Sequence, residues 1–217
     1  MYNILQPFGP MIYHGQCSEE FLKFLNESLD PTRTEAENMS HVLAGNISEQ
    51  YKLIGTPQTF VDHVYPHVLA YVAACHERHN ASVLDPAAGG SGEVVQNVHF
   101  TMPVAPWINY QKKYEFNPLH MHGGELSAVV MVDIPKEIEE FYYESHGTTN
   151  MPAAGLLEFV DGKGGYMYSG SHKVVPKTGD FFIFPADLKH GVYPFSVDVE
   201  RISLSFNISG VEVNPDK

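Results

Sequence analysis

Hydrophobic positions recur with two different periods along the chain, and the change falls near residue 85. Before that point, apolar side chains repeat every three or four residues, which is typical of amphipathic helices. The first predicted helix begins after Ser18, whose hydroxyl can cap a helix, and ends at Asp30-Pro31. The second runs from about Thr59 to His79, and Pro66 within it predicts a kink or a later start at that turn.

After a turn-rich connector, residues 84–92, the pattern changes to short segments rich in β-branched and aromatic residues. The predicted strands are 93–102, 105–111, 126–134, 155–160, 172–175, 180–184 and 199–209. Short strands without intervening helices predict a mainly β fold, a sandwich or a jelly roll. Residues 135–154 form the longest connection in this region, and we expect a lid or a short helix there.

This pattern predicts one structural domain with two parts. Residues 1–92 are expected to form an N-terminal helical region, and this annex packs on a β region of residues 93–217. The last predicted strand has one apolar face and one polar face. If it lies between the helical annex and the rest of the β region, the annex covers the apolar face and the polar face lines a cavity.

Composition narrows the functional classes. The chain has 217 residues, with 13 Lys+Arg and 26 Asp+Glu, so its formal net charge is −13. Such acidity repels phosphates, and we expect no nucleic-acid partner. No apolar run approaches the length of a membrane helix, so no membrane association is expected. Two cysteines and no recognisable signal peptide predict reduced thiols and a cytoplasmic location.

Histidine is abundant, with 12 in the chain, and two of them form the segment His120-Met121-His122. Residues two apart in a strand point to the same face, so these imidazoles would lie side by side. That geometry suits neighbouring positions on one metal ion. Further along, an apolar strand closed by Pro185 leads into a loop that presents His190, which could meet the pair from a facing strand.

The polar face of the last strand carries an unusual set of side chains. Alternation puts Arg201, Ser203, Ser205 and Asn207 on one face and apolar residues on the other. An arginine that lines a cavity requires an anionic partner, and a carboxylate is the natural one because it can accept two hydrogen bonds.

Together, the segments NPLHMHGGELS, GDFFIFPADLKH and ERISLSFNI resemble the Fe(II)/2-oxoglutarate-dependent dioxygenases, most closely a subfamily found in bacteria and their phages. The resemblance covers about residues 107–209. It implies a double-stranded β-helix, Fe(II) as cofactor, and 2-oxoglutarate and O2 as co-substrates. His120 and His190 then match iron ligands, whereas Arg201 and Ser203 match the residues that bind the far carboxylate of 2-oxoglutarate. Tyr114, Asn109 and Asn117 match positions from which a side chain can reach the co-substrate.

The sequence departs from that family at one ligand. Where the usual iron triad has a carboxylate, two residues after the first histidine, this chain has His122. We favour His122 as the third ligand, because Fe(II) and dianionic 2-oxoglutarate are neutral together and need no further negative charge. Alternatively, a bulge at Gly123-Gly124 could bring in Glu125, or the position could be left to water.

The expected function is a 2-oxoglutarate-dependent hydroxylase, in which His120, His122, His190 and Arg201 form the active site. The same histidines with Glu125 also resemble the cupins, so a three-histidine cupin enzyme without 2-oxoglutarate is one alternative. A non-catalytic jelly-roll binding protein is the other. The expected substrate is a small molecule or a protein side chain, and the sequence is compatible with a homodimer.

Overall fold

The computed structural model describes residues 9–54, 58–81, 94–162 and 164–215, and most of its regular structure is β. The helices are α1 (Glu19–Glu35), α2 (Gln58–Ala81) and α3 (Lys136–Ser145). The strands are β1 (Tyr13–Gln16), β2 (Glu49–Lys52), β3 (Val98–Thr101), β4 (Trp107–Gln111), β5 (Asn117–His120), β6 (Leu126–Asp133), β7 (Leu157–Val160), β8 (Ser171–Val174), β9 (Asp180–Pro185), β10 (Lys189–Val192) and β11 (Arg201–Val213). The predicted mainly β class is confirmed.

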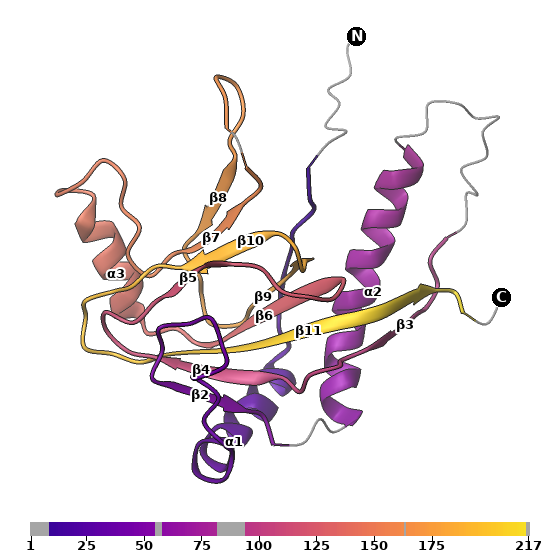
Figure 1. The fold of residues 1–217 in the computed structure, drawn as a ribbon, viewed down its shortest axis with the longest axis horizontal. Helices are drawn as coiled ribbons and strands as arrows, with labels where there is room; N and C mark the ends of the chain where they lie inside the picture. The colour runs from indigo at the N-terminus through magenta and orange to yellow at the C-terminus, as the bar shows by residue number, and fades with distance from the viewer. Residues whose placement is uncertain (1–8, 55–57, 82–93, 163, 216–217) are drawn as a thin grey trace.

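The strands form two antiparallel sheets (Figure 1). The larger sheet has the order β1-β9-β6-β11-β4-β2, and β3 also pairs with β11. The smaller sheet has the order β5-β10-β7-β8. Buried side chains fill the space between the sheets, and they are Met131, Leu157, Phe159, Phe182, Phe184 and Leu188.

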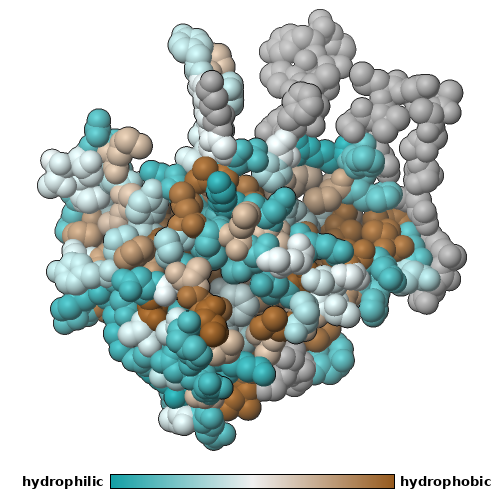
Figure 2. All heavy atoms as spheres, viewed as in Figure 1, coloured by the Kyte–Doolittle hydropathy of each residue, from teal (hydrophilic) through white to brown (hydrophobic). Residues whose placement is uncertain are grey.

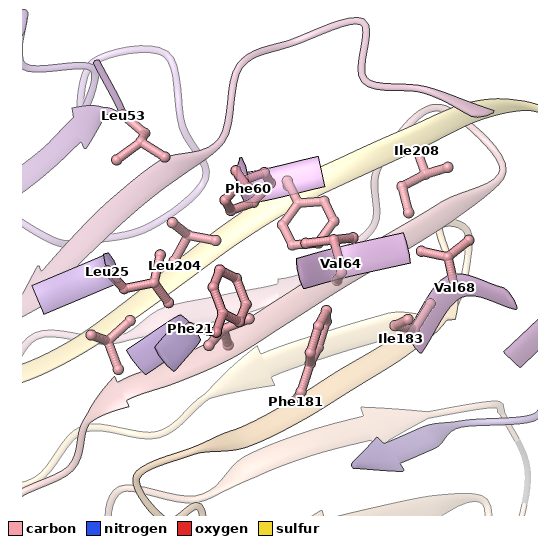
Figure 3. Close-up of a cluster of buried hydrophobic side chains, with 14 of the residues drawn as sticks. Phe21, Leu25, Leu53, Phe60, Val64, Val68, Phe181, Ile183, Leu204 and Ile208 are labelled. Atoms are coloured by element: carbon pink, nitrogen blue, oxygen red, sulfur yellow. The ribbon is translucent and has the colours of Figure 1, made fainter. Parts of the chain in front are cut away.

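A second and larger core lies between α1, α2 and the other face of the larger sheet (Figure 3). Phe21 of α1 and Phe60 of α2 meet in an edge-to-face contact, with ring centroids 5.7 Å apart. On the sheet side, Phe206 of β11 lies in edge-to-face contact with Phe60 at 5.4 Å. The larger sheet is therefore covered on one face by helices and on the other by the smaller sheet.

Strand β11 runs through the middle of the larger sheet and has the two faces that the sequence predicts. Its apolar side chains, Ile202, Leu204, Phe206 and Ile208, pack in the helix-side core. Its polar side chains Arg201, Ser203 and Ser205 line a cavity between the two sheets. The alternation of this strand is thus confirmed.

The predicted helix ends need correction. Ser18 caps α1 as expected, since its Oγ accepts the N–H of Phe21 at 3.1 Å. The predicted end at Asp30-Pro31 is wrong, because α1 continues through Pro31 to Glu35. This last turn is held by tertiary contacts: Thr32 is buried and Arg33 pairs with Glu49 and Glu200. α2 likewise runs through Pro66, so the later start is also wrong.

Four short strands, β1, β2, β5 and β10, are absent from the predicted set of strands. Two of them, β1 and β2, come from the N-terminal region and form the two edges of the larger sheet. The predicted boundary between residues 92 and 93 falls outside the described residues, so the division into two parts stays a prediction. Residues 135–154 contain the short helix α3.

The outer surface is mixed in character. On the face shown in Figure 2, hydrophilic residues predominate and hydrophobic ones form separate patches between them. None of the helices in the described residues has the length and hydrophobicity that a membrane span requires. Cys17 and Cys75 are both free thiols.

Candidate active site

Pairing between β5 and β10 brings the three predicted histidines together. His120 and His190 are register partners across these two strands, although they lie far apart in the sequence. Gly191 permits this close pairing, because a Cβ at that position would lie 3.0 Å from the carbonyl oxygen of Asn117. The ring of His122 lies 4.8 Å from that of His120 and 5.1 Å from that of His190. One nitrogen from each ring can be chosen so that all three lie within 4.8 Å of one another.

Backbone carbonyls orient two of these imidazoles. Nδ1 of His120 lies 2.7 Å from the carbonyl oxygen of Pro118, and Nδ1 of His190 lies 2.9 Å from that of Leu188. An Nδ1–H that donates to a carbonyl leaves Nε2 with a free lone pair, which is the form that binds a metal. Asp187, three residues before His190, is exposed and has no part in this orientation.

Burial keeps the three imidazoles neutral. It lowers the pKa of His190 to about 3 and that of His122 to about 4, and the other imidazoles add to both shifts. Burial also lowers the pKa of His120. Since a metal ligand must be deprotonated, the cluster is ready to bind a cation at neutral pH.

At another wall of the same cavity, Arg201 is buried to an unusual degree. Its side chain is 2% exposed, and its Nη1 donates to the carbonyl oxygen of Gly155 at 2.8 Å. Nε has no hydrogen-bond partner among the described residues, and no carboxylate there pairs with the guanidinium. Burial lowers the pKa of Arg201 to about 10, so it stays charged at neutral pH. An unpaired buried cation is costly, and a bound anion would relieve that cost.

The histidines and Arg201 line one cavity. Its walls are largely apolar or neutral and polar, and they comprise Ile47, Trp107, Asn109, Gln111, Asn117, Ser127, Ala128, Val129, Leu157, Phe184, Val192, Ser203 and Ser205. Arg201 is the only lining residue that is charged at neutral pH, among those described. The cavity therefore favours a small anion.

The predicted co-substrate residues fall into two groups. Asn109 lines the cavity and donates from Nδ2 to Ser203 Oγ at 3.3 Å. Asn117 also lines it, because an irregularity in the pairing of β5 with β10 turns Asn117 and His120 to the same side. Tyr114 does not line the cavity. It sits in a turn at φ 66°, and its side chain is 67% exposed.

Glu125 lies apart from the histidines. Its side chain is exposed, and Oε2 accepts the backbone N–H of Val211 at 2.7 Å. A bulge that would bring this carboxylate to the metal is absent from the described structure, where His122 occupies the place beside His120 and His190. The geometry thus agrees with a three-histidine site better than with a site that includes Glu125.

The sequence of the cavity region matches a known family. Residues 105–207 fit the family model described as putative 2OG-Fe(II) oxygenase. This segment, a little under half of the chain, is therefore similar to the 2OG-Fe(II) oxygenases. The matched range includes all three histidines, Arg201 and Ser203. No protein of curated function matches the chain.

Two solved structures share the fold of this chain. A prolyl hydroxylase from Trichoplax adhaerens, in complex with a peptide fragment, is 10% identical with a TM-score of 0.51, covering 93% of this chain and 83% of that one. The epimerase SnoN, in complex with Fe3+, alpha ketoglutarate and nogalamycin RO, is 14% identical with a TM-score of 0.51, covering 94% and 81%. At such identities the likeness concerns the fold alone, and it confirms the predicted jelly roll, or double-stranded β-helix.

The chemistry of the cavity lining fits Fe(II) and 2-oxoglutarate. Neutral imidazoles suit iron, and three of them lie on one side of the cavity. The unpaired guanidinium suits a carboxylate, and Ser203 adds a hydroxyl next to it on the same strand face.

The sequence prediction missed several buried polar residues: Gln111 and Ser127, which line the cavity, and Gln50 of β2, which bonds to the cavity residue Asn109. The side chain of Gln50 is 1% exposed and donates from Nε2 to Asn109 Oδ1 at 2.7 Å. The segment EQYK shows no alternation that would identify a strand. Its conformation depends on pairing with β4, which a local pattern does not reveal.

Proposed function

We propose that this chain is an Fe(II)- and 2-oxoglutarate-dependent hydroxylase. In this proposal His120, His122 and His190 hold the iron, and Arg201 with Ser203 binds the far carboxylate of 2-oxoglutarate. One observation carries the proposal: a fully buried guanidinium without an acidic partner opens into the same cavity as three neutral imidazoles. A structural arginine would need a carboxylate, whereas here the ligand supplies it.

The third histidine fits this scheme by charge. Three neutral imidazoles add no negative charge to a centre that already receives a dianion. Arg201 contributes the remaining positive charge at another wall of the cavity. Among the described lining residues no carboxylate opposes the entry of 2-oxoglutarate.

Each residue then has a defined task. The carbonyls of Pro118 and Leu188 keep Nε2 of His120 and His190 available for the metal. Arg201 and Ser203 fix the direction in which the co-substrate lies. Phe184, which contacts the ring of His190 at 4.6 Å, helps to exclude water. Bound together, Fe(II), 2-oxoglutarate and O2 supply the oxidation of a substrate C–H bond.

The substrate we propose is a small molecule or a protein side chain. This range is supported by the two structural neighbours, one bound to a peptide fragment and the other to nogalamycin RO. The cytoplasmic location rests on the two free cysteines, Cys17 and Cys75. That location, the homodimer and the lack of a nucleic-acid partner stay predictions from the sequence.

An anaerobic titration tests the proposal. Fe(II)-loaded protein mixed with 2-oxoglutarate should develop the weak visible charge-transfer band of an iron–2-oxoglutarate chelate. Arg201→Ala should abolish saturable binding at the same concentrations. Lys113→Ala is the matched control, because it removes one positive charge from an exposed side chain and should leave the titration unchanged.

Two results would contradict the proposal. One is the absence of the band in the wild type together with unchanged 2-oxoglutarate binding in Arg201→Ala. The other is oxygen consumption with a small substrate in the complete absence of 2-oxoglutarate, which would point to the cupin type of chemistry.

A further inference from the structure

A row of polar side chains crosses three strands of the larger sheet and ends at the proposed co-substrate site. Gln50 of β2 is the register partner of Asn109 of β4, and Asn109 is the register partner of Ser203 of β11. All three side chains are more than nine-tenths buried. The row therefore connects the N-terminal region, which lies outside the family match, with the cavity.

The hydrogen bonds in this row have a direction. Gln50 Nε2 donates to Asn109 Oδ1 at 2.7 Å, so the amide group of Asn109 turns its Nδ2 toward β11. There Nδ2 donates to Ser203 Oγ at 3.3 Å and to Ser205 Oγ at 3.2 Å. A hydroxyl oxygen that accepts from an amide keeps its own proton for another acceptor. Ser203 can then donate into the cavity, next to Arg201.

With the Asn109 amide in the opposite orientation, Ser203 would no longer donate its hydroxyl proton into the cavity. If the Asn109 amide were turned over, its Oδ1 would face the serines and accept their hydroxyl protons. A carboxylate beside Arg201 would then meet the lone pairs of Ser203 instead of its O–H. Gln50 is the only described side chain bonded to Asn109 Oδ1, so it decides between the two directions.

The burial of Gln50 also requires an explanation. Its Oε1 is buried without a hydrogen-bond partner in the described part of the chain. An unpaired buried carbonyl costs stability, and an apolar side chain of the same size would avoid that cost. A glutamine is thus a poor choice for packing alone, and its Nε2 is the group that has a partner.

We propose that Gln50 is a positioning residue, which holds Asn109 so that Ser203 donates its hydroxyl proton to the far carboxylate of 2-oxoglutarate. This inference rests on the proposed function. It assigns part of the affinity for the co-substrate to a strand that comes from outside residues 105–207. It also predicts that Gln50 acts only through Ser203 and its neighbour, without touching the ligand.

A double-mutant cycle tests this inference. Fe(II)-loaded wild type, Gln50→Met, Ser203→Ala and the double variant are titrated anaerobically with 2-oxoglutarate. Trp107, the only tryptophan in the chain, lines the cavity and reports binding by its fluorescence. We expect Gln50→Met to raise the Kd about tenfold in the wild type and less than twofold in the Ser203→Ala background. The iron content should be unchanged, because the histidines are untouched.

Tyr51→Phe is the control on the same strand, since its ring packs against Tyr110 on the helix side of the sheet. It should leave the Kd unchanged. Thermal unfolding shows whether each variant folds, and Gln50→Leu replaces Gln50→Met if the latter does not.

Three outcomes would overturn the inference. The first is an unchanged Kd in Gln50→Met while Arg201→Ala loses binding, which leaves the proposed function intact. The second is an equal rise in both backgrounds, which would mean that Gln50 does not act through Ser203. The third is a wild type that does not bind 2-oxoglutarate, which overturns the proposed function together with the inference.

Discussion

The two faces of β11 differ sharply in chemical character. On the helix side, Leu204, Phe206 and Ile208 are fully buried among the apolar residues of α1 and α2 (Figure 3). On the cavity side, Arg201 and Ser203 are also buried, but among polar groups that lack part of their hydrogen bonds. The same strand therefore carries stabilising contacts on one face and unsatisfied groups on the other.

This difference separates stability from function within one strand. Close packing of apolar side chains contributes to the free energy of unfolding, whereas an unpaired buried charge lowers it. Residues that reduce stability at a cavity wall are expected to bind something. We therefore expect substitutions on the helix face to lower stability, and substitutions on the cavity face to weaken ligand binding without lowering stability.

The largest effect is expected on the helix face. Phe206 contacts Phe60 at 5.4 Å and Phe181 at 6.1 Å, so Phe206→Ala would leave a void in the core. We expect a loss of about 3–5 kcal/mol in the free energy of unfolding, measured with urea on metal-free protein. The neighbouring residue, Ser205, lies on the opposite face of β11. Ser205→Ala should lower the free energy of unfolding by about 1 kcal/mol or less. A comparable loss in both variants would contradict the division between the faces.

The next largest effect concerns Arg201→Met, which keeps an unbranched apolar stem and removes the guanidinium and its charge. Affinity for 2-oxoglutarate should fall about 100-fold, or roughly 2.7 kcal/mol. The stability of the ligand-free protein should not fall, because an unpaired buried cation has been removed. Thermal unfolding with and without 2-oxoglutarate measures both quantities. A variant that unfolds would show that Arg201 is structural. A variant that binds 2-oxoglutarate as the wild type does would show that Arg201 does not hold the co-substrate.

A smaller effect is expected where the histidine cluster departs from the usual triad. His122→Asp restores the carboxylate, so iron affinity should stay within about tenfold of the wild type. The added negative charge should lower the affinity for 2-oxoglutarate, since the metal centre with its bound dianion becomes anionic. Glu125→Gln should change neither, because Oε2 of Glu125 is occupied by the N–H of Val211. Metal content and 2-oxoglutarate titration of the two variants check this, and a loss of iron in Glu125→Gln would favour the alternative ligand.

Local patterns revealed the parts of the site that lie within one strand. The alternation along β11 predicted both faces. The spacing of His120 and His122 predicted that the two rings lie together, but β5 ends at His120, so the expected shared strand is wrong. Strong apolar periodicity predicted α2, where Phe60, Val64 and Val68 form the buried stripe. In these segments the spacing of apolar side chains matches the spacing of buried positions, so the local sequence is sufficient to predict the element and its buried face.

Other parts depend on pairing between distant segments. His190 meets His120 because β10 pairs with β5, and the four-residue strands β2 and β5 are too short to show a period. Gln50 was missed for this reason. Tyr114 was expected at the co-substrate, but its positive φ in the turn after β4 could not be inferred from its neighbours. Pro31 within α1 shows how the contacts of Arg33 can override a local signal.

We propose above that one cavity holds iron at the three histidines and 2-oxoglutarate at Arg201. A crystal grown anaerobically with Fe(II) and 2-oxoglutarate tests it most directly. We expect iron bonded to His120, His122 and His190, with the far carboxylate of 2-oxoglutarate on Arg201 and Ser203. Iron ligated by Glu125, or 2-oxoglutarate bound away from Arg201, would contradict it.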